Sequence, residues 1–335
     1  MADRRSAAWE PLLNAYGLAG AEVTPVQAER GKWVVRVSTP RGSACLKELH
    51  HSRERSLFAL GAQHHVAQRG GNVAPVLPTR GGDLLVEWQG KLFAAYGWVE
   101  GRRPRFDRLP DWQQMVQGLA AFHRATPGYQ PPAGARVSSK LGRWPHLYQV
   151  MLEQLAQCQR LLPARVGREA AAQLSPLFDR FRRRGEEAMA LLAARDYEGY
   201  CQEVAGAGGF LCHQDYGPGN AILTPRGPVV LDLDGVTFDL VSRDLRKLLY
   251  KQGEMRGWDP GGLAALLDWY QAVHPLHRAE LPLLLADLSF PHGLHGAVKG
   301  LRTGPVAPAR ILRAARLEQA KEQALARFAA GQGRR

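Results

Sequence analysis

The chain has 335 residues, of which 45% are hydrophobic and 22% are charged, a balance that excludes a disordered or fibrous protein. This length exceeds one small core and predicts two lobes or domains. The formal net charge of +13 predicts a surface that attracts anions, among them nucleotides, nucleic acid and acidic polymers, without choosing among them.

The four cysteines are too far apart to indicate a zinc site or a disulfide framework. Residues 1–10 are charged and lack the apolar stretch of a signal peptide. The most apolar stretch, residues 281–290, is interrupted by Asp287 and is too short to cross a bilayer. We therefore expect a protein without a membrane partner that is made in the cytoplasm.

The first hundred residues are predicted to be mostly strand around one helix. The β-branched run at 32–39 and the strand at 44–49 flank an Arg-Gly turn and predict a hairpin. A helix is expected over 52–68, because its apolar residues end at two glycines. Three further short strands are expected at 73–77, 83–88 and 92–98, separated by glycine turns.

Beyond the Gly-Arg-Arg-Pro break at residues 101–104, the pattern becomes mainly helical. Helices are expected at 111–124, 146–162, 167–195, from about 244 onward, and in the basic tail at 308–335. Short buried strands interrupt them at 210–212, 221–224 and 228–233. The predicted fold is α+β, with a small β-rich lobe over 1–100, a hinge near 96–101, and a larger, mainly helical lobe over 102–335.

The most informative pattern is a polar loop between these buried strands. Residues 211–223 read LCHQDYGPGNAIL, and residues 229–234 read VVLDLD. Asp215 can orient an acceptor hydroxyl and take its proton, and Asn220 offers a carbonyl oxygen to a divalent cation. Asp232 ends an apolar strand, where its carboxylate can hold the same cation; Mg²⁺ prefers such oxygen ligands. The sequence therefore predicts a catalytic loop for phosphoryl transfer.

The first lobe supplies candidate nucleotide-binding residues. Lys47 lies among apolar residues of the second predicted strand, from which a long cation can reach the α- and β-phosphates of ATP. Glu54, at the start of the following helix, is either its acidic partner or a member of a surface ion pair. The extended segment at Trp98 and Val99 offers backbone groups to adenine, while the Trp98 ring is expected in the core.

These residues resemble the kinase-like aminoglycoside phosphotransferase (APH) superfamily, whose signature is His-Gly-Asp, four residues, Asn, and then an apolar strand ending in Asp. The resemblance implies that Asp215 is the catalytic base, that His213 shapes the loop, and that Asn220 and Asp232 hold Mg²⁺ beside ATP. Gln214 departs from the usual Gly, and Asp234 and Asp239 are expected to be loop carboxylates or carboxylates that support the metal ligands. No G-x-G-x-x-G motif precedes the hairpin, so the phosphate clamp is expected to use backbone donors of residues 28–32.

A narrower resemblance runs through almost the whole chain. The strand lysine, the Trp-Val-Glu-Gly-Arg hinge, the Cys-His-Gln-Asp loop, Leu-Asp-Leu-Asp and a late Leu-Ser-Phe-Pro together are similar to the CotS-type spore coat proteins. This resemblance implies assembly onto the spore coat, with coat proteins or an anionic matrix as partners. Two hypotheses stay open: an ATP-dependent phosphotransferase acting on a small-molecule or protein hydroxyl, and a catalytically idle coat component.

Nucleic acid is not an expected partner. The basic tail at 308–335 does not show the aromatic interleaving expected of a nucleic-acid binder, and no nucleic-acid-binding module is recognisable. The expected partners are therefore a nucleotide and a hydroxylated acceptor whose identity the sequence does not reveal.

Overall fold

The computed structural model describes residues 3–27 and 33–332. The chain forms two compact units, each built from two segments. Unit 1 comprises Met1–Ser139 and His213–Phe238, and unit 2 comprises Lys140–Cys212 and Asp239–Arg335. The predicted catalytic loop from His213 onward, Lys47 and Asp232 all belong to unit 1, so the candidate site can be described within one unit.

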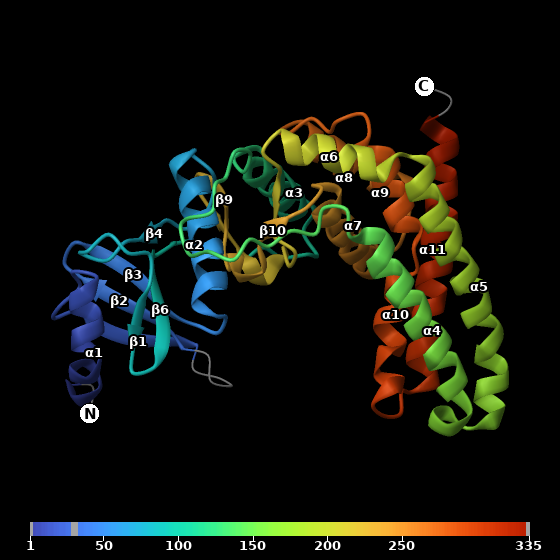
Figure 1. Ribbon diagram of the computed structural model, residues 1–335, viewed down its shortest axis with the longest axis horizontal. Helices are drawn as coiled ribbons and strands as arrows, with labels where there is room; N and C mark the ends of the chain where they lie inside the picture. Colours follow the sequence, from blue (N-terminus) through green and yellow to red (C-terminus); the bar gives the residue numbers. More distant parts are fainter. Residues whose placement is uncertain (1–2, 28–32, 333–335) are drawn as a thin grey trace. The chain divides into compact units, whose positions relative to one another are not determined.

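Unit 1 contains a six-stranded sheet in the order β1-β2-β3-β6-β4, with β5 also paired to β6 (Figure 1). Its strands are β1 (Glu22–Gln27), β2 (Val34–Thr39), β3 (Gly42–Leu49), β4 (Val76–Leu77), β5 (Val86–Trp88) and β6 (Lys91–Gly97). All these pairs are antiparallel. The register places Lys47 of β3 between Val34 of β2 and Ala94 of β6, so Lys47 lies on a central strand.

The two faces of this sheet are covered by different helices of unit 1. Helix α1 (Asp3–Ala15) lies on one face, where its Leu12 and Leu13 pack with Leu46 (Figure 1). On the other face Leu60 of α2 (Arg53–Gln68) packs with residues of β4 and β6. Since side chains alternate along β3, Lys47 points to the opposite face from Leu46.

The remaining elements of unit 1 carry the loop residues. They are α3 (Leu109–Arg124), the 3₁₀ turn η1 (Pro218–Asn220), the antiparallel strands β8 (Ala221–Thr224) and β9 (Gly227–Val230), the 3₁₀ turn η2 (Leu233–Gly235) and β10 (Thr237–Phe238). Helix α3 packs closely on β9, because Gly118 leaves room for the Pro228 ring. The open end of the β8–β9 hairpin carries both Asn220, just before β8, and Asp232, shortly after β9.

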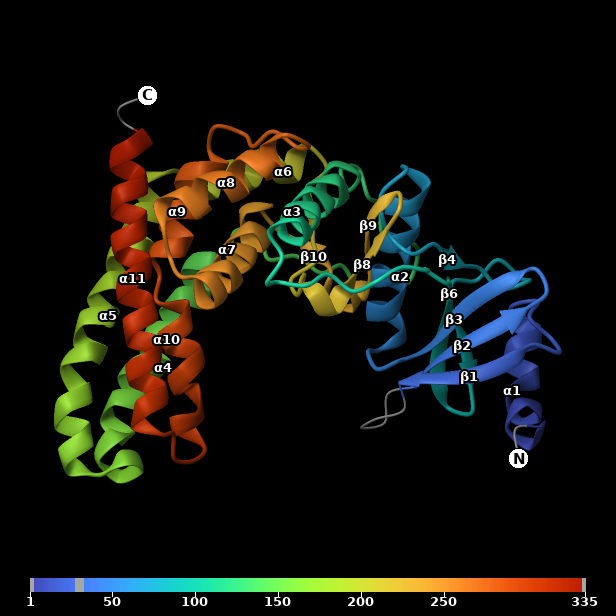
Figure 2. The same cartoon turned by 180° about the vertical axis from the view of Figure 1, so that it is seen from behind.

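Unit 2 is almost entirely helical. Its elements are α4 (Trp144–Val166), α5 (Arg168–Ala194), α6 (Tyr197–Gly206), β7 (Leu211–Cys212), α7 (Ser242–Arg256), α8 (Pro260–Gln271), α9 (Glu280–Ser289), α10 (His292–Val298), η3 (Lys299–Arg302) and α11 (Pro308–Gln332). The long helices α4, α5 and α11 run side by side in both ribbon views (Figures 1 and 2). Aromatic residues such as Trp144, Phe178 and Phe290 fill the core of this unit.

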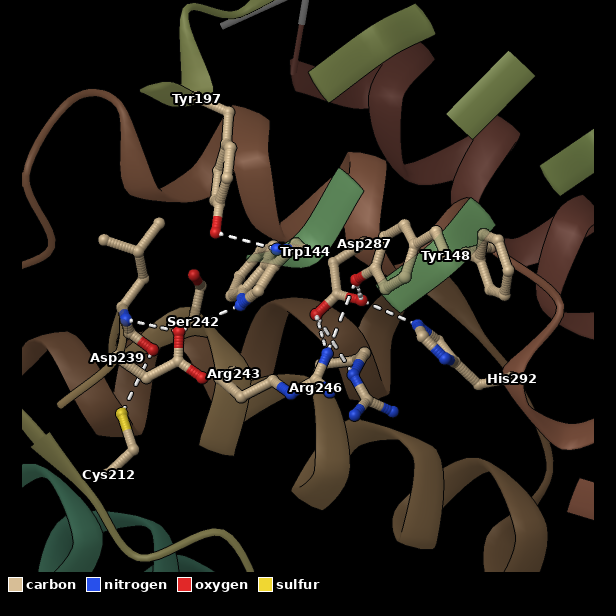
Figure 3. A network of polar contacts seen from close by, with 12 residues as sticks. Trp144, Tyr148, Tyr197, Cys212, Asp239, Ser242, Arg243, Arg246, Asp287 and His292 are labelled. Atoms are coloured by element: carbon tan, nitrogen blue, oxygen red, sulfur yellow. Dashed lines mark hydrogen bonds and ion pairs between the residues drawn. The ribbon is translucent and has the colours of Figure 1, made fainter. Parts of the chain in front are cut away.

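A polar network lies inside this apolar core (Figure 3). Asp287 of α9 accepts hydrogen bonds from the Tyr148 hydroxyl and from Nε2 of His292, the latter at 2.7 Å. Its other oxygen forms an ion pair with Arg246 of α7, 3.0 Å from Nε. Nearby, Nε1 of Trp144 donates to Asp239. These contacts join α4, α7, α9 and α10.

Most predicted elements are confirmed, and two of the three misses share a physical reason. The hairpin, the helix at 52–68 and the long helices at 146–162 and 167–195 all occur, within a few residues of the predicted bounds. Helix α1, strand β1 and helix α6 were not predicted. Pro11 lies inside α1 and Pro25 inside β1, and proline usually argues against both kinds of element.

Within residues 3–27 and 33–332, none of the helices has both the length and the apolar character needed to cross a lipid bilayer.

Candidate functional site

Lys47 meets two carboxylates of the turn after strand β9. Its Nζ lies 2.6 Å from Oδ1 of Asp232 and 2.8 Å from Oδ2 of Asp234. The Lys47 side chain is 18% exposed, whereas that of Asp232 is 46% exposed, so the pair borders solvent. We call Lys47, Asp232 and Asp234 the open cluster. The sequence predicted the first two members, and the structure brings them together across 185 positions of chain.

In the open cluster, the lysine and the carboxylates each stabilise the ionised form of the other. Burial by itself would lower the pKa of Lys47, but the carboxylates of Asp234 and Asp232 outweigh burial and raise that pKa. Burial likewise works to raise the pKa of Asp232, yet the nearby Lys47 ammonium lowers it below the ordinary value. Lys47 is therefore a fixed cation and Asp232 a fixed anion at neutral pH.

Asp232 is held at a sharp bend of the backbone. The peptide N–H of Val230, in the last position of β9, donates to the Asn72 carbonyl at 2.7 Å, and that of Leu231 donates to the Asn220 carbonyl at 2.9 Å. Asp232 then adopts φ +60°, the left-handed region that non-glycine residues rarely occupy. This bend turns its carboxylate toward Lys47 and starts the turn η2.

His213 ties the catalytic loop to the same strand end. Its Nε2 lies 2.8 Å from the Leu231 carbonyl, and its Nδ1 accepts from the Asp215 N–H at 3.3 Å. Both contacts are satisfied by the tautomer with the proton on Nε2. The ring is fully buried and meets Phe122 and Tyr216 edge-on. His213 therefore fixes the distance between the loop and the residue before Asp232.

Asn220 and Asp215 face each other within the loop. Nδ2 of Asn220 donates to the Asp215 backbone carbonyl at 2.9 Å and lies 3.5 Å from its carboxylate oxygen Oδ2. Because the amide nitrogen is engaged there, the Asn220 carbonyl oxygen points the other way and can serve as a ligand. Asp215 itself is exposed. The structure thus groups Asp215 and Asn220, and links both to the Asp232 strand through His213 and Leu231.

Gln214 occupies a conformation that suits glycine. Its φ is +72°, in the left-handed region, although the side chain is buried. A glycine enters this region without steric cost, which gives a physical reason for the usual Gly of the motif. The substitution noted in the sequence is thus accommodated by local backbone strain, and the loop retains its hydrogen bonds.

In the predicted hinge, the backbone groups of Val99 and the ring of Trp98 differ from their neighbours in how they are covered. The Trp98 N–H donates to the Ser43 carbonyl at 3.2 Å, whereas the N–H and C=O of Val99 have no hydrogen-bond partner among the described residues. The Trp98 ring is half-buried rather than in the core, with the Arg36 guanidinium 4.7 Å from its centre. The backbone at Val99 therefore keeps a donor and an acceptor that are unpaired within the described residues.

Of the two alternatives left open for Glu54, the pairing with Lys47 does not occur in the described part of the chain. Glu54 is exposed in the first turn of α2, where hydrogen bonds from its own backbone N–H and from Ser52 lower the pKa of its carboxyl. Helix α2 begins at Arg53, and its first turn directs Arg55, the residue after Glu54, toward the turn η2. The partners of Lys47 are instead Asp232 and Asp234.

The contacts of two further residues of this region were not predicted from the sequence. Asp234 was expected only as a loop or supporting carboxylate, and it contacts Lys47 directly. The spacing of Asp232 and Asp234, with one residue between them, was the available signal. Arg55 reaches the same turn, and its sequence context offered no sign of this. The predicted phosphate clamp at residues 28–32 lies outside the described residues.

The sequence of the chain matches a known protein family and a known relative. Residues 22–281 match the model of the phosphotransferase enzyme family known as APH. The chain belongs to this phosphotransferase family. The chain is also 30% identical to spore coat protein S of Bacillus subtilis (strain 168) over 282 residues, which cover 84% of this chain and 80% of that protein. The predicted resemblance to APH proteins and to the CotS type is confirmed.

Solved structures show the same phosphotransferase fold. An aminoglycoside phosphotransferase from Alicyclobacillus acidocaldarius superimposes with a TM-score of 0.73 at 19% identity, covering 92% of this chain and 91% of that one. Amicoumacin kinase, solved with AMP-PNP, Ca²⁺ and its substrate, gives a TM-score of 0.55 at 17% identity and covers 96% of both chains. The predicted α+β, protein-kinase-like fold is confirmed.

Proposed function

We propose that this protein is a phosphotransferase that moves the γ-phosphate of ATP to a hydroxyl group of an acceptor, with Mg²⁺ as the metal. One observation carries the proposal: Nζ of Lys47, from the centre of the sheet, lies 2.6 Å from the carboxylate of Asp232 at the end of β9. A cation for phosphates and an anion for a metal therefore meet at one exposed point, as phosphoryl transfer requires.

The nucleotide would contact two parts of unit 1. The Lys47 ammonium is a compact charge that can bind the α- and β-phosphates. At the hinge, the unpaired N–H and C=O of Val99 can form the two hydrogen bonds that adenine offers at its edge. The half-buried Trp98 ring next to it adds apolar surface for the base.

The residues present fit a magnesium ion. Asp232 supplies an ionised and partly exposed carboxylate, and Asn220 supplies an amide oxygen whose companion nitrogen is already engaged by Asp215. Hard oxygen donors of this kind are the ligands that Mg²⁺ prefers, and the ion commonly keeps phosphate oxygens in its shell. When bound, the metal would neutralise charge on the phosphates.

Asp215 is proposed as the catalytic base. Its carboxylate is exposed, its backbone carbonyl is fixed by Asn220, and its N–H is fixed by His213. A carboxylate held in this way can accept a hydrogen bond from an acceptor hydroxyl and take its proton as phosphate arrives. His213 contributes by shaping the loop rather than by touching the acceptor.

The cellular setting is proposed from the likeness to spore coat protein S, which covers 84% of the chain. We propose that the protein is made in the cytoplasm and assembled onto the spore coat. A formal net charge of +13 suits contact with an anionic matrix or with acidic coat proteins. The acceptor would then be a hydroxyl of a small molecule or of a protein at that surface.

The test separates binding from turnover. In wild-type protein we expect calorimetric titration with Mg·ATP to give saturable binding, and a screen of hydroxylated acceptors to give phosphate transfer. Asp215→Ala should lower kcat roughly 10²- to 10⁴-fold, the usual contribution of a positioned base, and leave ATP affinity unchanged. Asp268→Ala removes an exposed carboxylate of α8 and should change neither quantity. Loss of both binding and turnover in Asp215→Ala, or of neither, would contradict the roles assigned.

A second candidate function is a coat component that keeps the fold without catalysis. It is favoured by the name of the relative, spore coat protein S, which names the coat and no enzymatic activity. In this case Asp232→Asn should assemble onto spores as the wild type does, while Mg·ATP titration of the wild type gives no heat of binding. Assembly that depends on an intact Asp232 would argue against a purely structural role.

A further inference from the structure

Arg55 reaches from helix α2 into the turn that follows Asp232. Its Nη2 donates to the backbone carbonyl of Asp234 at 2.7 Å and to that of Val236 at 2.6 Å. These two carbonyls belong to the turn η2 and the residue after it. One guanidinium nitrogen therefore bridges two peptide groups of the segment that begins with Asp232.

The turn needs such a support. Asp232 is held in a left-handed conformation, which costs a non-glycine residue free energy unless its surroundings determine it. The turn's own backbone includes a hydrogen bond from the Val236 N–H to the Leu233 carbonyl at 2.9 Å. The two Arg55 contacts are charge-assisted and hence stronger than a neutral pair.

The environment of Arg55 differs from that of an ordinary surface arginine. The side chain is half-buried, its guanidinium lies 5.2 Å from the centre of the Phe58 ring, and burial lowers its pKa. Its Nη1 is buried without a hydrogen-bond partner among the described residues. A cation placed there loses hydration, so its contacts with the turn must offset that loss.

Asp234 is consequently held from two elements. Its carboxylate binds Lys47 of β3, and its carbonyl binds Arg55 of α2. The helix thus contributes a cation that holds the backbone of the turn that begins at Asp232, whereas the sequence left Glu54 open as either the partner of Lys47 or a member of a surface ion pair.

We propose that Arg55 is a positioning residue that fixes Asp232 for metal binding by clamping the backbone of residues 234–236. The inference rests on the proposed function, since it takes Asp232 as a metal ligand. Groups that orient a metal ligand typically contribute 10- to 100-fold to metal affinity. Arg55 should therefore affect the metal more than the nucleotide.

The test measures Mn²⁺ binding by electron paramagnetic resonance in the presence of a non-hydrolysable ATP analogue. Arg55→Met should weaken Mn²⁺ binding about tenfold, while analogue affinity measured in EDTA stays unchanged. Arg55→Lys keeps the charge but lacks the planar fork of the guanidinium. Its Mn²⁺ affinity should therefore lie between those of the wild type and Arg55→Met. The matched control is Arg53→Met, which removes the same charge from the same turn of α2 at an exposed position.

A second measurement covers the case in which Arg55→Met is destabilised. Hydrogen exchange of the ligand-free protein should be faster at residues 233–236 in Arg55→Met and Arg55→Lys than in Arg53→Met. If the wild type binds normally but the Arg55 and Arg53 variants have equal Mn²⁺ affinities, the positioning role alone is overturned. The same holds if hydrogen exchange at residues 233–236 is equal in the three variants. Wild-type protein that binds neither Mn²⁺ nor the analogue would instead overturn the proposed function, and the positioning role with it.

Discussion

Two charged clusters among the described residues have similar composition and opposite accessibility. The open cluster of unit 1 joins Lys47 to two carboxylates at a point where Asp232 is 46% exposed. The sealed network of unit 2 joins Asp287 to Tyr148, Arg243, Arg246 and His292, and its Asp287 side chain is fully buried (Figure 3). Only the first can exchange a protein partner for a ligand.

The polar groups around Asp287 in the sealed network are already paired with one another. Burial acts to raise the pKa of Asp287, but Arg246 and the other donors outweigh it and lower that pKa. His292 is the reverse case, since burial lowers its pKa to about 3 and the ring stays neutral at physiological pH. Each Asp287 oxygen already has a cationic or donor partner. The contrast teaches that accessibility, more than residue type, separates a binding site from a structural one.

Removing the carboxylate at the centre of the sealed network should give the largest loss of stability. Asp287→Asn leaves Arg246 and Arg243 buried beside a neutral amide, and breaking a buried pair in this way costs about 3–5 kcal/mol. Urea unfolding followed by circular dichroism measures the change. If the contrast holds, the variant should lose most of its resistance to unfolding.

The matched change in the open cluster is Asp232→Asn. Here solvent can rehydrate Lys47, and Asp234 still neutralises it, so the free energy of unfolding should change by no more than about 1 kcal/mol. Equal destabilisation by Asp232→Asn and Asp287→Asn would show that the two clusters do not differ as described.

A second buried carboxyl of unit 2 predicts a dependence of stability on pH. Glu280 accepts from the Tyr200 hydroxyl and from the Ser242 N–H, both at 3.1 Å, and burial raises its pKa to about 7. The folded protein therefore keeps this proton to a higher pH than the unfolded chain does. The stability that this carboxyl contributes is present near pH 4 and is lost as the pH rises through 7.

The comparison of wild type with Glu280→Gln isolates this effect. Between pH 5 and pH 8 the wild type should lose roughly 2 kcal/mol of unfolding free energy relative to the variant, which cannot titrate there. Neutral His292 and His295 act in the opposite direction, because burial lowers their pKa values to about 3 and 4, but they are present in both proteins. Parallel pH profiles of the two proteins would contradict the prediction.

The sequence allowed the fold and the central pair of the site to be predicted because both depend on local signals. Alternating residues of β3 place Lys47 and Leu46 on opposite faces, and the apolar run before Asp232 marks a strand end. The spacing of His213, Asp215 and Asn220 also placed Asp215 and Asn220 in one loop. None of these inferences needed knowledge of distant contacts.

The contacts that decided the lysine's partners were not local. Glu54 and Arg55 are neighbours at a helix start, and which of them faces the turn depends on how α2 packs against unit 1. Charge made Glu54 a candidate partner of Lys47, and the sequence could not choose between that pairing and a surface ion pair. The helix instead presents the cation to backbone carbonyls, an arrangement that leaves no periodic signal in the sequence.

The smallest predicted effect concerns the strained residue beside the open cluster. Gln214 has φ +72°, so glycine should be better than alanine there, the reverse of their order in a helix. Gln214→Gly and Gln214→Ala both remove the buried side chain, and their difference therefore reports the backbone. The glycine variant should be more stable by about 1 kcal/mol in urea unfolding, since left-handed backbone penalises Cβ more than added chain entropy penalises glycine. An alanine variant as stable as the glycine variant would mean that the loop relaxes away from this conformation, and the fixed spacing between His213 and Asp215 would lose its support.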